Sequence, residues 1–187
     1  MKKETNNNHK VNFREFILGG QDGLVNVLGL VLGVASATNE TRIVIIAGIV
    51  ATVAESVSMG AVAYTSSKAG KDYYTSLIKD DKDRKLLQKH KFLLREFDNP
   101  LKSSWIVGSA TLIGSLIPLI PFFIFNVKTS IIVSLALAAI TLFAVGALKA
   151  RLSIGNWKRS GIELMIIGII AALLGYGAGL LLKGYGI

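Results

Sequence analysis

Residues 16–37 read FILGGQDGLVNVLGLVLGVASA, and residues 43–64 read IVIIAGIVATVAESVSMGAVAY. Each run is long enough to cross a bilayer as one helix, which takes about 20 apolar residues. Each run also contains a single charged residue, Asp22 in the first and Glu55 in the second. A carboxylate at that depth costs about 2.5–3.5 kcal/mol on lenient estimates, so it usually faces a partner, a cation or a water-filled path. This pattern predicts ion handling inside a membrane.

Three later runs contain no Asp, Glu, Lys or Arg and bring the number of expected membrane spans to five. The 187 residues are 51% hydrophobic and have a mean hydropathy of +0.53, which fits an integral membrane protein. We therefore expect an all-α integral membrane protein with five transmembrane helices and a short cytoplasmic helical insertion between helices 2 and 3. The expected spans cover residues 16–37, 43–64, 104–125, 129–148 and 164–182.

The same pattern divides the chain into four parts within a single membrane domain. We expect a polar cytoplasmic tail at residues 1–15 and the first two helices at 16–66. A cytoplasmic amphipathic segment should follow at 67–103, and the last three helices at 104–187. An Asp-Asn-Pro turn at 98–100 should separate the amphipathic segment from the third span.

The net charge of +9 has a distribution that argues against a nucleic-acid partner. Of the 21 lysines and arginines, 18 fall in residues 1–15, 68–102 and 149–159, which five spans place on one face of the membrane. The positive-inside rule then puts the N-terminus in the cytoplasm and the C-terminus outside the cell or in a vacuolar lumen. The lipid bilayer itself accounts for the segregation, with no need for a nucleic acid.

Small residues and prolines mark expected packing features of the spans. Gly29 and Gly33 form a GxxxG pattern, as do Gly175 and Gly179, and such patterns let helices approach closely. Two interpretations stay open: packing within one subunit, and homodimerisation through this face, which we prefer. The third span contains IPLIPFF at residues 117–123 and should be kinked or irregular there.

Four polar or soft side chains form the candidate site. The pairs Asp22/Asn26 and Glu55/Met59 are both spaced i,i+4, so the members of each pair share a helix face. Asp22 and Met59 lie about 9 and 7–8 Å from the cytoplasmic ends of their helices, whereas Asn26 and Glu55 lie about 15 and 13–14 Å from them. The two antiparallel helices thus offer two tiers of metal ligands. Nearby hydroxyl oxygens could come from Thr52, Ser56 and Ser58.

The chemistry of this set favours a weakly held divalent transition metal. Carboxylate and amide oxygens suit hard divalent cations, and a thioether shifts the preference towards later transition metals. The chain has no cysteine, and the five spans contain no histidine, so a tight zinc site of the usual kind is not expected.

Structural explanations for the same residues stay open. Met59 could be core packing, and Asn26 and the serines could be interhelical hydrogen-bond partners. Asp22 and Glu55 could share a proton, or pair with a lysine such as Lys68 near the inner face.

The motifs at these positions resemble those of the vacuolar iron transporter family, and the resemblance extends over all five spans. The paired DGL and SMG signatures are specific at this separation. The matching residues are GGQDGLV at 19–25, LGL at 28–30, AG at 47–48, SMG at 58–60, Tyr64 and Lys68.

The resemblance implies a five-helix homodimer that moves Fe²⁺, and often Mn²⁺, out of the cytosol, with proton antiport as the driving force. It implies that Asp22 and Met59 line the path at the dimer interface, with the metal as substrate rather than as a resident cofactor.

Two departures from the family pattern stand out. Ala51 occupies the place of a glutamate found in plant and yeast members, and Glu55, one turn later, is our candidate to replace it. The cytoplasmic region is short and basic, with Gly70 and Leu77 where acidic residues are expected. We expect that this region has lost the family's metal-gathering site.

We therefore predict a divalent metal transporter with Asp22, Asn26, Glu55 and Met59 as metal ligands. The alternatives are a membrane scaffold or metal sensor that transports nothing, and a transporter of another cation. No nucleophile–base pair or cofactor loop indicates an enzyme.

Overall fold

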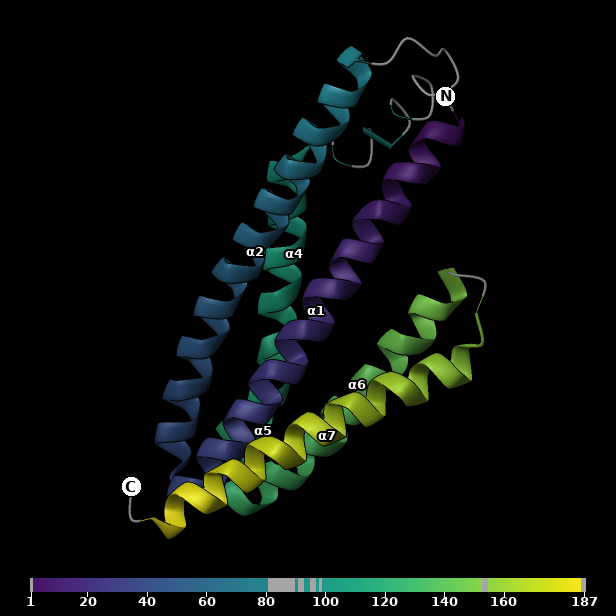
Figure 1. The fold of residues 1–187 in the computed structure, drawn as a ribbon. Coiled ribbons are helices and arrows are strands. Elements are labelled where there is room, and N and C mark those ends of the chain that lie inside the picture. The colour runs from purple at the N-terminus through teal and green to yellow at the C-terminus, as the bar shows by residue number, and fades with distance from the viewer. Residues whose placement is uncertain are drawn as a thin grey trace.

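The computed structural model describes residues 2–80, 99–152 and 155–185, together with residues 90, 93, 94 and 97. Every regular element in these residues is helical (Figure 1). Five helical segments are long and apolar enough to cross a membrane, which confirms the expected all-α membrane fold. These segments are Asn12–Thr38, Thr41–Lys79, Pro100–Ile124, Val127–Arg151 and Trp157–Gly184.

The first two helices are longer than the hydropathy of the sequence indicates. Helix α1 covers Lys2–Thr38 and helix α2 covers Thr41–Asp80. Residues 2–15, which we expected to be a separate tail, are therefore the first turns of α1. The expected cytoplasmic segment likewise begins as a continuation of α2. Hydropathy locates the apolar part of a helix, but polar residues such as Lys and Glu are good helix formers and extend it beyond the lipid.

The sharp turn between α1 and α2 depends on Asn39, which has a positive φ of 53°. Asparagine tolerates this left-handed conformation better than most residues. The Thr38 hydroxyl accepts a hydrogen bond from the Glu40 amide (3.3 Å) and donates one to the Val34 carbonyl (2.8 Å). The turn thereby fixes α1 and α2 as an antiparallel pair.

The third span begins with a capped helix, α4, at Pro100–Leu116. The Asn99 side chain accepts a hydrogen bond from the Lys102 amide (3.1 Å), and proline stands at the first helical position, where its missing N–H is not needed. The turn predicted at 98–100 therefore gives way directly to α4, four residues before the expected start of the span.

The two prolines of the third span interrupt it, as predicted. Helix α4 gives way to a 3₁₀ turn, η2, at Ile117–Leu119 and then to the short helix α5 at Ile120–Ile124. The Ser134 hydroxyl of the next helix donates to the Pro118 carbonyl (2.7 Å), and that of Ser130 donates to the Pro121 carbonyl (3.0 Å). Helix α6 thus supplies donors to the irregular stretch where lipid has none.

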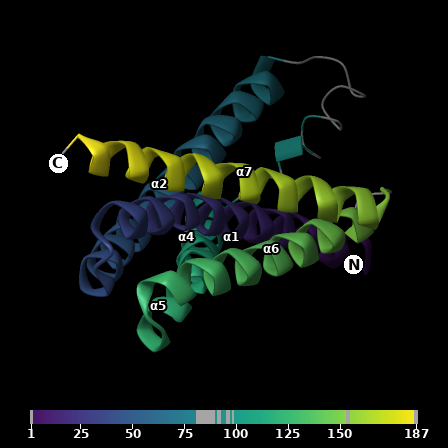
Figure 2. The same ribbon diagram turned by 90° about the horizontal axis from the view of Figure 1, so that it is seen from below.

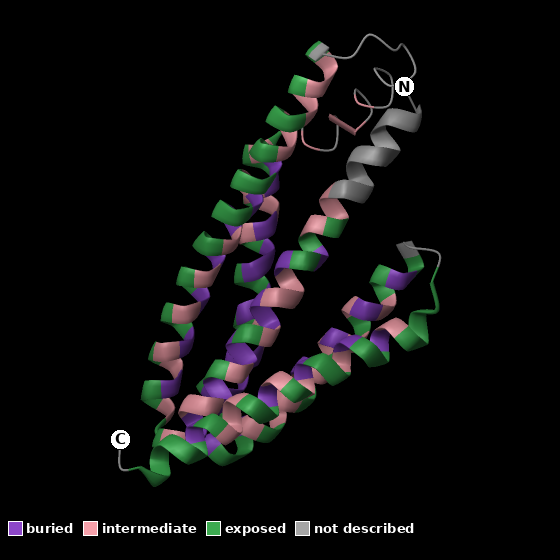
Figure 3. Ribbon diagram, viewed as in Figure 1, coloured by how far each residue is buried: buried purple, intermediate pink, exposed green. Residues whose placement is uncertain are grey.

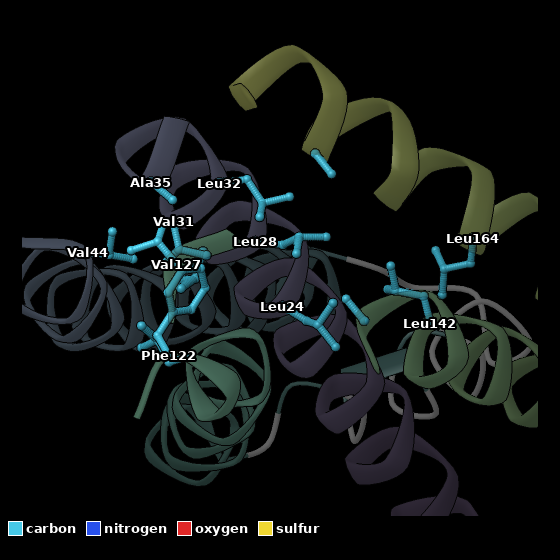
Figure 4. Packing of buried hydrophobic residues seen from close by; sticks show 14 residues of the cluster. Leu24, Leu28, Val31, Leu32, Ala35, Val44, Phe122, Val127, Leu142 and Leu164 are labelled. Atoms are coloured by element: carbon cyan, nitrogen blue, oxygen red, sulfur yellow. The ribbon is translucent and has the colours of Figure 1, made fainter. Parts of the chain in front are cut away.

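Helix α1 lies at the centre of the molecule, against all the other spans (Figure 2). Helix α6 covers Val127–Leu152 and helix α7 covers Trp157–Gly184, and the two form a hairpin beside α1. A row of α1 side chains lies in the hydrophobic core, together with side chains of the other spans (Figure 4). The fully buried members of this row are Leu24, Val27, Leu28 and Val31.

The two GxxxG patterns meet each other within one chain. A Cβ added at Gly175 would overlap the Gly29 carbonyl oxygen, and one added at Gly179 would overlap that of Gly33. These glycines therefore let α7 lie directly on the backbone of α1. Our preferred interpretation, homodimerisation through this face, was wrong because α7 of the same chain occupies it.

The helix predicted within residues 67–103 falls largely outside the described residues. Leu93 and Leu94 are helical and half-buried, and Phe97 is half-buried. The Phe97 ring stacks on Tyr74 of α2, with ring centroids 5.8 Å apart. It also lies where a side chain at Gly70 would project, so an acidic residue at position 70 would displace it.

Candidate functional site

The candidate site lies between α1 and α2, where Asn26 joins the two carboxylates. The Asn26 amide donates one hydrogen bond to a Glu55 carboxylate oxygen and one to Asp22 Oδ2 (3.3 Å). The depth comparison thus correctly placed Asn26 beside Glu55. Asp22 and Glu55 are half-buried and Asn26 is exposed, so the three side chains form a polar cluster on the outside of a single chain.

The contact with Asn26 settles which way Glu55 points. Its carboxylate turns towards α1 and shares a donor with Asp22, so it belongs to the same cluster. Ala51, one turn away on α2, is half-buried and packs against the apolar core. Glu55 is therefore the α2 carboxylate that reaches this side of α1.

The other polar residues of α2 that the sequence suggested as partners form no hydrogen bond to the cluster among the described residues. The Ser56 hydroxyl donates to the Thr52 carbonyl of its own helix (2.6 Å), and both residues are buried. Ser58 and Lys68 are exposed. Among the described residues neither carboxylate has a lysine or arginine partner, so the suggested pairing with Lys68 does not occur there.

Met59 lies one turn closer to the C-terminal end of α2 than Glu55 and is half-buried. Its side chain lines a cavity of about 190 Å³ between α1, α2 and α4. Among the described residues no hydrogen bond joins it to Asp22, whose carboxylate accepts one from Asn26. In the single chain, the predicted tier of Asp22 and Met59 is therefore not joined by a hydrogen bond. The tier of Asn26 and Glu55 is joined by one.

Glu15 belongs to this region and escaped the analysis of the sequence. The Ser67 hydroxyl donates to Ser103 (3.1 Å), and the Ser103 hydroxyl donates to the Glu15 carboxylate. This chain of hydrogen bonds joins α2, α4 and α1 at the wall of the cavity. A spacing of seven residues from Asp22, two turns on one face of α1, was the signal that could have found it.

The glycines around Asp22 explain how α1 is held. A Cβ at Gly19 would overlap the Val107 carbonyl, and one at Gly23 would overlap the Thr111 carbonyl. Helix α4 therefore lies directly on this stretch of α1. Asp22 lies about 60–100° around the helix from these two glycines, so it flanks the packed face and is half-buried.

The cluster can bind a cation through hard oxygen ligands. Two carboxylates supply two negative charges, and an amide that uses its NH₂ group on them keeps its oxygen for a third partner. In the part of the chain that the structure describes, no three side chains of His, Cys, Asp or Glu gather as a metal site would require.

These features define a multi-pass membrane protein with ionisable residues inside its spans. The chain belongs to the VIT family, whose model matches residues 13–91 and 84–180. This finding confirms the resemblance drawn from the DGL and SMG motifs.

Its relatives come from archaea, fungi and plants. The chain is 30% identical to an uncharacterized protein of Methanocaldococcus jannaschii, over 86% of this chain and 85% of that protein. It is 27% identical to the protein CCC1 of Saccharomyces cerevisiae, over 84% of this chain and 65% of that protein. It is 25% identical to vacuolar iron transporter 1 of Tulipa gesneriana, over 87% of this chain and 84% of that protein.

Replacing Asn26 by leucine should weaken metal binding by about 10–100-fold, which is the usual cost of removing a group that orients metal ligands. The two carboxylates lose their shared donor and repel each other without compensation. Titration of the purified protein with Mn²⁺ measures the change. Replacing Thr65, an exposed α2 residue whose hydroxyl bonds only to its own helix, by leucine is the control and should leave the affinity unchanged. Equal affinities for wild type and Asn26→Leu would contradict a role for the cluster in binding.

Proposed function

We propose that this protein exports a divalent transition metal, Fe²⁺ or Mn²⁺, from the cytosol in exchange for protons. The observation that carries the proposal is the polar cluster of Asp22, Asn26 and Glu55 within two membrane spans. Ionisable groups at that depth are costly unless they serve a path or a partner. The names of the plant relatives, vacuolar iron transporters, support iron as a substrate.

Proton exchange follows from the chemistry of carboxylate ligands. A carboxylate binds a cation in its ionised form, so protons and metal compete for Asp22 and Glu55. A proton arriving from the acidic side would release the metal there. Orientation follows from the basic segments, which place the N-terminus in the cytoplasm and the C-terminus outside the cell or in a vacuolar lumen.

The transporter would work as a homodimer assembled on the open face of α1 and α2. In one chain the cluster faces outwards at membrane depth, where lipid offers no hydrogen-bond partner. The same two helices carry exposed apolar side chains, including Leu18 (56% exposed) and Val62 (55% exposed), and much of the outer face of α2 is exposed (Figure 3). A second copy related by a two-fold axis would cover the cluster and bring a second set of carboxylates to it.

Metal flux into proteoliposomes under an imposed pH gradient tests the function. Uptake of Fe²⁺ or Mn²⁺ that follows the gradient supports a proton-coupled exporter, and metal competition identifies the preferred ion. Flux of a different cation would mean that the proposed substrate is wrong but that the proposed transport path is correct. A folded dimer that moves no ion would instead favour a scaffold or sensor. The residues of the cluster are those of a cation path, and none of these outcomes calls for an enzyme.

A single introduced cysteine tests the dimer interface, because the chain contains no cysteine of its own. We expect Val62→Cys, beside the cluster, to form a covalent dimer with a short bifunctional thiol reagent in membranes. Ile140→Cys on α6, which is 68% exposed and away from the cluster, is the matched control and should not cross-link. Cross-linking of Ile140→Cys alone would place the interface elsewhere.

A further inference from the structure

A cavity of about 190 Å³ opens at the cytoplasmic end of α1, α2 and α4, below the polar cluster. Glu15 and Arg14 line it from α1, Met59 from α2 and Ser103 from α4, and Phe97 lines it from the segment that precedes α4. It therefore contains a carboxylate, a thioether and hydroxyl groups, together with one guanidinium. Nothing in the proposed function so far uses Glu15.

We propose that this cavity is an inlet site, where Glu15 binds the hydrated divalent cation before it passes to Met59 and Asp22. The inference rests on the proposed transport function and adds a ligand and a waiting position to it. One Glu15 oxygen accepts the Ser103 hydroxyl, and Ser103 is itself held by Ser67. These two buried serines hold the half-buried carboxylate at the wall of the cavity.

The volume suits a cation that keeps part of its water shell. A water takes about 30 Å³ in the liquid, so the cavity has room for an ion with several waters. A site of this kind need not strip the ion, which is the expensive step of entering a membrane. Dehydration is then left to the deeper cluster, where two carboxylates are available.

The cavity ends one helical turn from the deeper cluster, because Met59 lines it and Glu55 lies four residues away on the same helix. Glu15 and Asp22 are two turns apart on one face of α1, and Met59 and Glu55 are one turn apart on α2. An ion leaving Glu15 thus meets the Met59 thioether and then the two carboxylates. The order of ligands runs from one carboxylate in a wet cavity to two at membrane depth.

Arg14 sets the strength of the inlet site. Its positive charge lines the same cavity and opposes the bound cation, so that the site holds the metal weakly. Weak binding suits a site that must pass its ion onwards. Removing either charge should therefore move the apparent affinity, and the two changes should have opposite signs.

The first test is the metal dependence of flux in proteoliposomes. We expect Glu15→Gln, which keeps an acceptor for Ser103, to raise the half-saturating Mn²⁺ concentration about tenfold with little change in maximal flux. Arg14→Gln should lower it. Glu163→Gln, an exposed glutamate on α7 outside the cavity, is the control and should behave like wild type. An unchanged half-saturating concentration in Glu15→Gln would overturn the inlet site.

A second measurement detects binding without transport. Ser66→Cys places a unique thiol at the exposed rim of the cavity. We expect Mn²⁺ to slow its reaction with a charged thiol reagent, and Glu15→Gln to abolish that protection. Protection that persists in Glu15→Gln would overturn the role of Glu15. If the Ser66→Cys protein shows protection but no flux, the inlet site stands and the transport function fails. If it shows flux without protection, the transport function stands and the inlet site fails.

Discussion

We expect that replacing Asp22 by alanine will abolish Fe²⁺ and Mn²⁺ flux while leaving the protein folded. Asp22 is one of the two carboxylates in the membrane cluster, and it lies one turn along α1 from Leu18, which lines the cavity that contains Met59. Groups that merely orient a metal ligand contribute about 10–100-fold to metal affinity, so losing a ligand itself should cost more than 100-fold. Flux in proteoliposomes under a pH gradient measures the loss.

The fold should survive this substitution for a structural reason. The partner of Asp22 in the described residues is Asn26, at 3.3 Å, and Asn26 keeps its hydrogen bond to Glu55 in the variant. No buried donor is left without an acceptor, and one charge is removed from the membrane. Size-exclusion chromatography and thermal unfolding should therefore match wild type.

Asp72→Ala provides the matched control. Asp72 lies on the same helix as Glu55, in the exposed part of α2 beyond the polar cluster. It carries the same charge, but no contact ties it to the cluster. We expect wild-type flux from this variant. Normal flux in Asp22→Ala would sink the proposed path, and a loss in both variants would mean that surface charge rather than the cluster controls transport.

The spans could be predicted from the sequence because lipid imposes a strong pattern on it. Runs of about 20 apolar residues have few structural alternatives to a transmembrane helix. The interruption at Pro118 and Pro121 was equally readable, since proline cannot donate to a helix. The N-terminal end of α1 and the C-terminal end of α2 could not be predicted in this way, because the helical turns beyond the lipid are polar and resemble a tail.

The GxxxG patterns show where sequence reasoning fails. Glycine spacing says that another backbone comes close, but it does not say which one. Here Gly29 and Gly33 of α1 meet Gly175 and Gly179 of α7, almost the whole length of the chain away. A contact within one chain and a contact between two copies have the same local signature.

Part of the candidate site could be predicted from the sequence, because two of its residues lie on helices that are neighbours in the chain. Asn26 and Glu55 lie on helices joined by a tight turn, so counting residues from that turn compares their depths directly. Glu15 and Ser103 are 88 residues apart, and their hydrogen bond depends on how α4 packs against α1 and α2. Such contacts follow from tertiary packing, which a single sequence does not encode in any short pattern.

Replacing Gly114 by alanine separates α1 from α4, and should lower both the stability and the flux of the protein. A Cβ at Gly114 would overlap the Gly20 carbonyl oxygen, next to Gln21 and Asp22. Backbone atoms cannot move aside as a flexible side chain can, so the helices must move apart. Overpacking of this kind costs about 1–3 kcal/mol. Thermal unfolding in detergent and metal flux measure the two effects.

The control is Gly177→Ala, in which the same methyl group is added to a membrane helix with no atom within 4 Å of it. Alanine favours a helix over glycine by about 1 kcal/mol, and both variants share this gain. The difference between them therefore isolates the overlap with Gly20. Equal stabilities would mean that α1 and α4 do not approach as closely as the structure has them. A stability loss with full flux would show that the position of Asp22 does not depend on α4. A loss of both ties the glycines beside Asp22 to function through the helix that they allow to pack there.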